Sequence, residues 1–206
     1  KTKGGKAVVI EFKAKLKNGV TQEELKPYIT GDKSVKVPNT AEYKINLGDR
    51  PELKKETPPV TVTPPPTTPE ITKKVNDQEH VNLQKVDEEF TYKVETTVPH
   101  NATKFEVTDT IKDVLDFSGE VKAKVDGEDI TDVKTEGKTL TVKLSEDQVK
   151  TKGGKAVVIE FKAKLKNGVT QDELKNYISE DKTVKVPNTA EYKINLGDRP
   201  ELKKET

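Results

Sequence analysis

A long internal repeat constrains this chain more than any other feature of its sequence. Residues 2–57 recur at residues 151–206, so the period is 149 residues. The two copies differ at five positions, Glu23/Asp172, Pro27/Asn176, Thr30/Ser179, Gly31/Glu180 and Ser34/Thr183. Helical solenoids repeat at roughly 20–50 residues, so a period of this length indicates a whole domain with its linker. The chain is therefore predicted to contain the C-terminal part of one repeat, residues 1–57, followed by a complete second repeat.

The hydrophobic residues are few, but their pattern suits β-strands. They make up 31% of the chain and gather in alternating stretches such as AVVIEFKAKL, which suffices for the thin core of a sandwich. Charged residues make up 35%, with the two signs interleaved and a net charge of +1. This distribution argues against a nucleic-acid partner or an anionic membrane surface, because both need clustered Lys and Arg. No apolar run reaches the roughly 20 residues of a membrane span, so membrane insertion is not expected.

The chain contains no cysteine and only two histidines. The lack of cysteine excludes disulfides, thiolate metal sites and cysteine nucleophiles, although exported β-domains often depend on disulfides. Neither a GxSxG motif nor a zinc motif is present. We therefore expect a protein without cofactor, metal or enzymatic turnover, for which some other covalent cross-link would be useful.

A proline-rich stretch divides the two repeats. Residues 58–69, PPVTVTPPPTTP, are predicted to form a semi-rigid polyproline II linker. The complete repeat then occupies residues 70–206.

Within residues 70–206 the hydrophobic period is mostly two. It predicts strands at Ile71–Val75, Phe90–Val98, Lys104–Asp109, Phe117–Val125, Thr139–Leu144, Ala156–Leu165 and Val184–Leu196. One helix is expected near residue 173, because Thr170 and Glu173 form a capping box before an apolar face. Short strands with regular turns indicate an all-β fold, an immunoglobulin-like sandwich with one short crossover helix.

Three polar residues interrupt apolar rows that should face the core. Lys73 lies between Ile71 and Val75, so alternation turns it inward and turns Lys74 outward. Asp109 continues the face of Phe105 and Val107, and Asn188 has the same parity as Val184 and Val186.

The motifs around these residues resemble a known family. KKVN at residues 73–76, FTYKVETTVP at 90–99, FEVTDTI at 105–111 and VPNTAEY at 186–192 follow the order found in isopeptide-forming, immunoglobulin-like repeats of Gram-positive fimbrial proteins and cell-wall-anchored adhesins. In that family a lysine on the first strand joins an asparagine on the last through a side-chain amide, and an acidic residue promotes the reaction. The resemblance implies that Lys73 is the nucleophile, Asn188 the acceptor and Asp109 the promoting acid.

The residues themselves leave other interpretations open. Lys73 and Asp109 could form a buried ion pair, and Asn188 could bond to backbone near Pro187. Lys74 is the rival nucleophile, and the rival acids are Asp113 and Asp116, whereas Glu106 has the wrong parity.

Other polar groups are weaker candidates. His80 and His100 stand in turn-like surroundings and are expected at the surface. The acidic stretch at residues 126–132 lacks the ordered alternation and terminal Glu of a calcium loop. Gly153 and Gly154 are predicted to form a turn.

Two functions fit this sequence. The first is a structural stalk repeat of an extracellular, cell-wall-anchored adhesin or pilus-like protein, with neighbouring repeats of the same chain as its partners. The alternative is a module that binds a host matrix protein or glycan through many copies, although the aromatic content is only 5%.

The first repeat raises a separate question. Residues 1–57 include Asn39, the counterpart of Asn188, but not the strands that would carry a matching lysine and acid. Alone, this segment would expose unpaired strand edges. We expect either further residues of the molecule or, less favourably, a strand-swapped second chain to complete its sheet.

Overall fold

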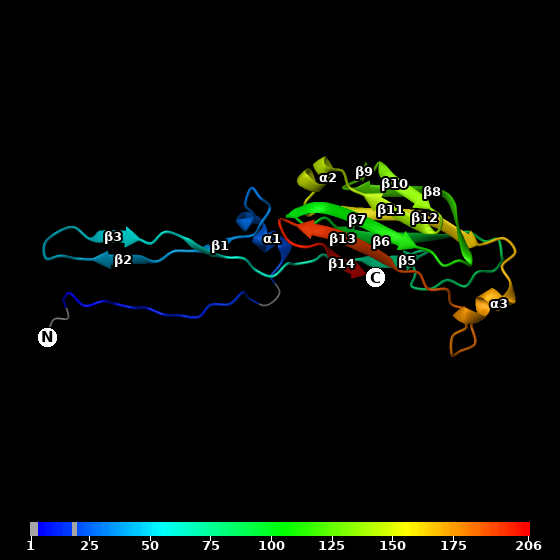
Figure 1. The fold of residues 1–206 in the computed structure, drawn as a ribbon, viewed down its shortest axis with the longest axis horizontal. Helices are drawn as coiled ribbons and strands as arrows, with labels where there is room; N and C mark the ends of the chain where they lie inside the picture. The colour runs from blue at the N-terminus through cyan, green and yellow to red at the C-terminus, as the bar shows by residue number, and fades with distance from the viewer. Residues whose placement is uncertain (1–3, 18–19) are drawn as a thin grey trace.

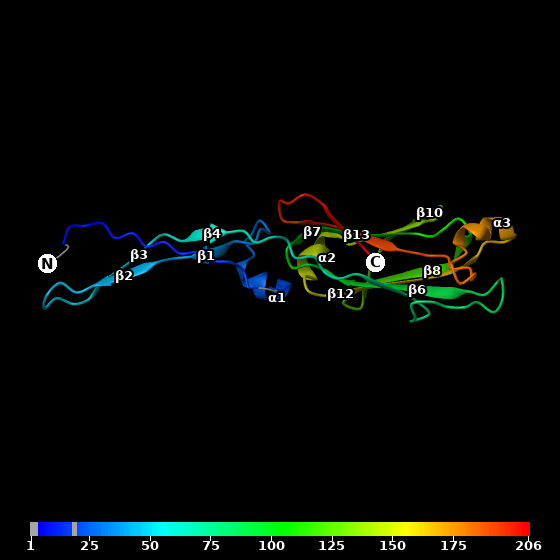
Figure 2. The same cartoon turned by 90° about the horizontal axis from the view of Figure 1, so that it is seen from below.

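The complete repeat folds as a sandwich of two five-stranded sheets. The computed structural model describes residues 4–17 and 20–206. One sheet has the strand order β5-β6-β12-β8-β9 and the other β10-β11-β7-β13-β14. Their strands are β5 (Thr72–Val75), β6 (Phe90–Thr97), β7 (Ala102–Thr110), β8 (Leu115–Val125), β9 (Glu128–Asp129), β10 (Asp132–Glu136), β11 (Thr139–Lys143), β12 (Ala156–Leu165), β13 (Ala190–Leu196) and β14 (Leu202–Glu205). Figure 2 shows the two layers edge-on.

Strict alternation of side chains builds the core between these layers. Phe90, Tyr92 and Val94 of β6 are buried, while the residues between them are partly exposed. Tyr192 and Ile194 of β13 are completely buried in the facing sheet. Each fully buried side chain of this size contributes about 1.5–3 kcal/mol relative to leaving it exposed. The expected immunoglobulin-like sandwich is confirmed.

The predicted strands match the observed ones closely in the middle of the repeat and less well at its end. The range Ala156–Leu165 is confirmed for β12. The last predicted strand starts too early, because β13 begins at Ala190 and residues 185–189 are irregular. Pro187 does not by itself account for the late start, because its counterpart Pro38 lies within β1 (Val37–Asn39), where β4 (Val60–Val62) pairs with it; no described strand pairs with residues 186–189. The chain then adds β14, which pairs with β13 from Glu191↔Glu205 to Ile194↔Leu202.

Short helices cap the ends of the sandwich. The expected helix is α3 (Gln171–Leu174), continued by the 3-10 turn η2 (Lys175–Tyr177). A further helix, α2 (Glu146–Thr151), was not predicted, although Ser145 and Gln148 form the capping box that starts it. No helix in the part of the chain that the structure describes is long and apolar enough to cross a membrane.

The first repeat has a different arrangement, because no described strand pairs with its residues 7–16. Its elements are α1 (Gln22–Leu25), η1 (Lys26–Tyr28), β1 (Val37–Asn39), β2 (Glu42–Ile45) and β3 (Leu53–Glu56), and β2 pairs only with β3. Residues 7–16 have the sequence of β12 but form no strand, and Phe12 is 71% exposed where Phe161 is 1% exposed. Figure 1 shows this part extending away from the sandwich.

The linker is only partly the free spacer that its prolines predict. Val60–Val62 form β4, which pairs antiparallel with β1 from Val37↔Val62 to Asn39↔Val60. The β-branched residues between the two proline groups therefore form a separate two-stranded sheet with β1 of the first repeat.

Candidate cross-linking site

Lys73, Asp109 and Asn188 come together between the two sheets. Lys73 lies on β5, an edge strand of one sheet, and Asp109 lies on β7 of the facing sheet. Asn188 precedes β13 by two residues, and β13 pairs with β7 at Ala190↔Asp109. The pairing of β13 with β7 thus sets Asn188 close to Asp109, while the stacking of the sheets brings Lys73 to both.

Alternation along β5 buries the Lys73 ammonium. Its side chain is only 5% exposed, whereas Lys74 is exposed on the outer face, as the parity predicted. The Lys73 Nζ atom lies 4.5 Å from the ring centre of Tyr92 and 5.4 Å from that of Phe161. Aromatic faces attract a cation at these distances, so Tyr92 and Phe161 form an apolar wall that holds the amine in place.

The Lys73 ammonium donates a hydrogen bond to the Asp109 carboxylate, whose side chain is 2% exposed. Burial lowers the pKa of Lys73 to about 8, although the Asp109 charge acts in the opposite direction. Burial likewise raises the pKa of Asp109, against the effect of Lys73. Both shifts favour the neutral forms, an amine and a carboxylic acid, because a dry site disfavours charge.

The Asn188 carboxamide is buried without a hydrogen-bond partner. Its Oδ1 and Nδ2 atoms, with Oδ1 of Asp109, are three of the four such side-chain atoms in the described residues. The carboxamide faces Asp109 and Tyr92 and lowers the pKa of both in the manner of a hydrogen-bond donor, although burial raises the pKa of Tyr92 to about 12; its atoms nevertheless do not reach hydrogen-bond geometry with either residue. Leaving a buried polar group unpaired costs about 1–3 kcal/mol, so this arrangement is expensive as it stands.

The rival acids lie elsewhere. Asp113 is exposed, and Asp116 pairs with Lys138 at 2.6 Å. Glu106 is 9% exposed, but it faces away from the core toward Lys143, at 3.3 Å. Asp109 is therefore the one acid of this set that contacts Lys73.

A groove of about 860 Å³ opens beside the three residues. Lys73, Tyr92 and Asn188 line it together with apolar side chains from α3 and from the irregular segment before β13. Tyr92 was missed in the sequence, although it shares the inward face of Phe90 and Val94 and could have been found by the same alternation.

The remaining candidates are placed as follows. Asn39 is exposed on β1, opposite Val60 of the linker. His80 is exposed as expected. The expectation for His100 was wrong, because it is 9% exposed and its Nε2 atom lies 2.5 Å from the Glu23 carboxylate of the first repeat. Asp126 in the acidic stretch pairs with Lys152 and Lys155.

Comparison with known proteins adds a sequence relative and several similar folds. No family model matches the chain. It is 45% identical over 201 residues to platelet adherence protein A of Streptococcus gordonii, a match that covers 95% of this chain and 5% of that protein.

The fold is similar to that of major pilins. The major pilin subunit of Bacillus cereus superposes with a TM-score of 0.53 at 21% identity, covering 81% of this chain and 53% of the pilin. The full-length major pilin SpaD of Corynebacterium diphtheriae gives a TM-score of 0.50 at 19% identity, covering 75% of this chain and 44% of that pilin. The chain thus spans about half the length of these pilins and a small part of its curated relative. It is similar in sequence to a streptococcal adhesin and in fold to the pilin domains of other Gram-positive bacteria.

Proposed function

We propose that the complete repeat is a stalk domain of a cell-surface adhesin or pilus-like protein, locked by a self-formed amide between Lys73 and Asn188. The observation that carries the proposal is the buried carboxamide with no hydrogen-bond partner beside a buried lysine and a buried acid. Each group is costly in this site while it stays separate, and the amide removes most of that cost.

The reaction needs no group beyond these three residues. Asp109 takes one proton from the Lys73 ammonium, which leaves a neutral amine and a neutral carboxyl. The lysine nitrogen then bonds to Cγ of Asn188, and Asp109 stabilises the developing charge on the amide oxygen. The bond from Cγ to the amide nitrogen breaks, and that nitrogen leaves as ammonia with one further lysine proton. The products are an amide with one N–H, one ammonia and a protonated Asp109.

The surroundings favour this direction. The pKa of Lys73 is lowered to about 8 by burial, so its neutral amine is accessible near neutral pH. The pKa of Asp109 is raised by burial, so its carboxyl can keep the proton. The groove beside Asn188 offers ammonia a route to solvent. The event occurs once for each domain, so the repeat is not an enzyme with turnover.

The position of the bond suits a domain under tension. The chain enters the sandwich at β5 and leaves it through β13 and β14. A covalent link between β5 and the residues before β13 would carry a pulling force across the fold, so that the strands between them need not unzip. The similarity to an adhesin and to pilins supports a stalk role on the outside of a Gram-positive bacterium, with anchoring to the cell wall.

Intact mass tests the cross-link directly. The wild-type chain should weigh less than its sequence by the mass of one ammonia. Asp109→Asn and Lys73→Met should both show the full sequence mass, and Lys74→Met, on the outer face of the same strand, should keep the deficit. A wild-type chain of full sequence mass would refute the cross-link.

A further inference from the structure

In the part of the chain that the structure describes, a compact segment of the first repeat, residues 21–35, contacts the complete repeat, and we call it the plug. It consists of α1, η1 and a loop closed by the bridge between Ile29 and Val35. The plug lies against the end of the sandwich that carries His100, Gly153, Gly154 and Gly197, which we call the socket. Figure 1 shows α1 at this end, between the hairpin of the first repeat and the sheets.

Polar contacts fix the plug to the socket and to the linker. The Glu23 carboxylate meets Nε2 of His100 at 2.5 Å, and this contact lowers the pKa of Glu23. The Gln22 side chain donates to the Thr67 carbonyl at 2.8 Å, and Arg199 donates to the Pro64 carbonyl at 2.5 Å. The proline linker is thereby held between the two repeats.

The apolar side chains of the plug lie against the linker and the socket. Leu25 and Val35 are 4% and 9% exposed, and they line one small pocket with the linker prolines and with Leu196 of the sandwich. In the second copy, residues 170–184, Leu174 is half-buried against the core of its own sandwich, whereas Val184, the counterpart of Val35, is 44% exposed.

The local structure of the two copies is the same, so local structure does not cause this difference. Both begin with a capping box, and both close the loop with an Ile–Val bridge. Lys33 has a φ of 63° and its counterpart Lys182 a φ of 61°. The burial of Val35 therefore comes from docking.

Glycines shape the socket for close approach. A Cβ atom on Gly197 would lie 2.9 Å from the carbonyl oxygen of Lys33 in the plug, and one on Gly154 would lie 3.0 Å from the Glu23 carboxylate. The counterparts in the first repeat, Gly48 and Gly5, would meet nothing within 4 Å. Gly48 and Gly197 share the same backbone, with φ of 61° and 60°, so only Gly197 carries an additional demand from the plug.

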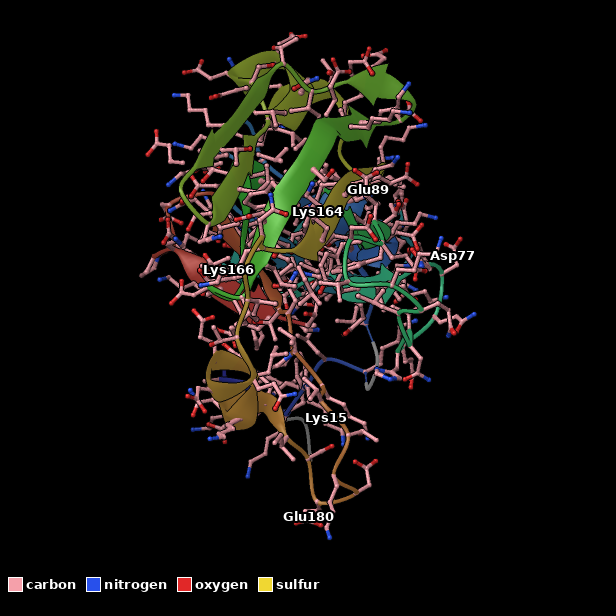
Figure 3. All side chains as sticks on the ribbon, turned by 90° about the vertical axis from the view of Figure 1, so that its right-hand side faces the viewer. Lys15, Asp77, Glu89, Lys164, Lys166 and Glu180 are labelled. Atoms are coloured by element: carbon pink, nitrogen blue, oxygen red, sulfur yellow. The ribbon has the colours of Figure 1, made fainter. Side chains whose placement is uncertain are left out.

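We propose that plug and socket form a rigid joint between consecutive repeats, and that residues 170–184 present the same plug to the socket of a second copy of the repeat. The joint extends the proposed stalk function, since it would keep successive domains in line, but it does not depend on the cross-link. Figure 3, seen from the α3 end, shows Glu180 at the tip of this second plug, projecting away from the sheets.

Hydrogen exchange on the intact chain tests the joint, because all five differences between the copies lie in residues 23–34 and so distinguish the two peptides by mass. After correction for intrinsic rates, amides of residues 21–36 should exchange at least about tenfold more slowly than those of residues 170–185. Without docking, the opposite order of exchange rates would be expected, because residues 170–185 are tethered to a complete sandwich and the first plug is not. Equal exchange of the two peptides would overturn the proposal.

Two matched pairs of variants assign any difference to the contact. Gly197→Ala should remove the extra protection of residues 21–36, whereas Gly48→Ala, with the same backbone strain, should leave it unchanged. Val35→Asp should remove it as well, whereas Val184→Asp should not. If the protection survives both Gly197→Ala and Val35→Asp, docking is not its cause. The intact mass of Gly197→Ala, Gly48→Ala and Val35→Asp should show the same ammonia loss as the wild type, which separates a failure of the joint from a failure of the cross-link.

An extended chain tests the partner of the second plug. A further copy of residues 58–206 is joined after Thr206. At the five positions where the two plugs differ, this added copy carries the residues of the first plug, so that peptide 170–185 remains unique. Exchange of residues 170–185 should slow to the level that residues 21–36 show in the original chain. Unchanged exchange there would show that a second copy of the repeat is not the partner.

Discussion

Replacing Asn188 with alanine should change the stability of the repeat in opposite directions depending on whether the cross-link forms. Without the bond, Asn188→Ala removes a buried carboxamide that has no hydrogen-bond partner, so the variant should be equally stable or up to about 3 kcal/mol more stable. With the bond, the same change deletes a covalent clamp, so the variant should be strongly destabilised. In either case the variant keeps both Lys73 and Asp109, which can pair as they do in the structure.

The size of the loss follows from the length of chain that the bond closes. A loop of about 115 residues between Lys73 and Asn188 corresponds to about 5 kcal/mol of loop entropy in the unfolded chain. For a domain of this size, residues 70–206, a loss of that magnitude lowers the melting temperature by about 15 °C.

Thermal unfolding followed by circular dichroism, with intact mass as the check on bond formation, measures the effect. Asn39→Ala is the matched control, because Asn39 has the same sequence neighbours but lies exposed on β1. It should leave both the melting temperature and the mass deficit unchanged. An Asn188→Ala variant as stable as the wild type, or more stable, would refute the clamp.

Three further outcomes follow from the same site and repeat. In Asn188→Ala, the free energy of unfolding measured by chemical denaturation should rise by about 2 kcal/mol between pH 7 and pH 9.5, because the unfolded chain holds a Lys73 proton that the folded chain has lost. The pKa of Lys73 is about 8 in the folded chain, and its ordinary value is 10.5. The double variant Lys73→Met/Asn188→Ala should lack this rise, and a rise of equal size there would contradict the assignment to Lys73. The melting temperature of Asp109→Asn should lie well below that of Asp116→Asn. The first variant leaves a buried lysine without its acid and without the bond, whereas Asp116 is half-exposed. Equal melting temperatures would argue against a role for Asp109. Brief chymotrypsin digestion should cut after Phe12 and spare Phe161, because the two residues are 71% and 1% exposed, although both stand in the sequence AVVIEFKAKL. Mass spectrometry reads the two cleavage rates, and equal rates would show that the burial of the two residues does not differ.

Much of the sandwich could be predicted because alternation is a local property. The strand Ala156–Leu165 and the inward direction of Lys73 and Asp109 follow from a side-chain period of two. α2 could have been found from its capping box at Ser145. β14 could not, because LKKE is short and mostly exposed and is a strand only through its pairing with β13.

His100 shows why the site at the joint escaped prediction. Its neighbours in the sequence, Pro99 and Asn101, are typical of an exposed turn. It packs against Gly153 and Gly154 and contacts Glu23, all of which are far away along the chain. No periodicity within either segment reports such a contact.

The repeat itself separates what the sequence determines from what tertiary structure decides. Both copies form the same capped helical turn, the same Ile–Val bridge and the same hairpin pairing of EYKI with LKKE, because these features depend on neighbours within a few residues to about 15. The fate of AVVIEFKAKL differs, since it is the central strand β12 where β6 and β8 flank it and an exposed, unpaired stretch where they are missing. Burial of a strand or a plug requires partners from distant parts of the chain, and only the complete fold supplies them.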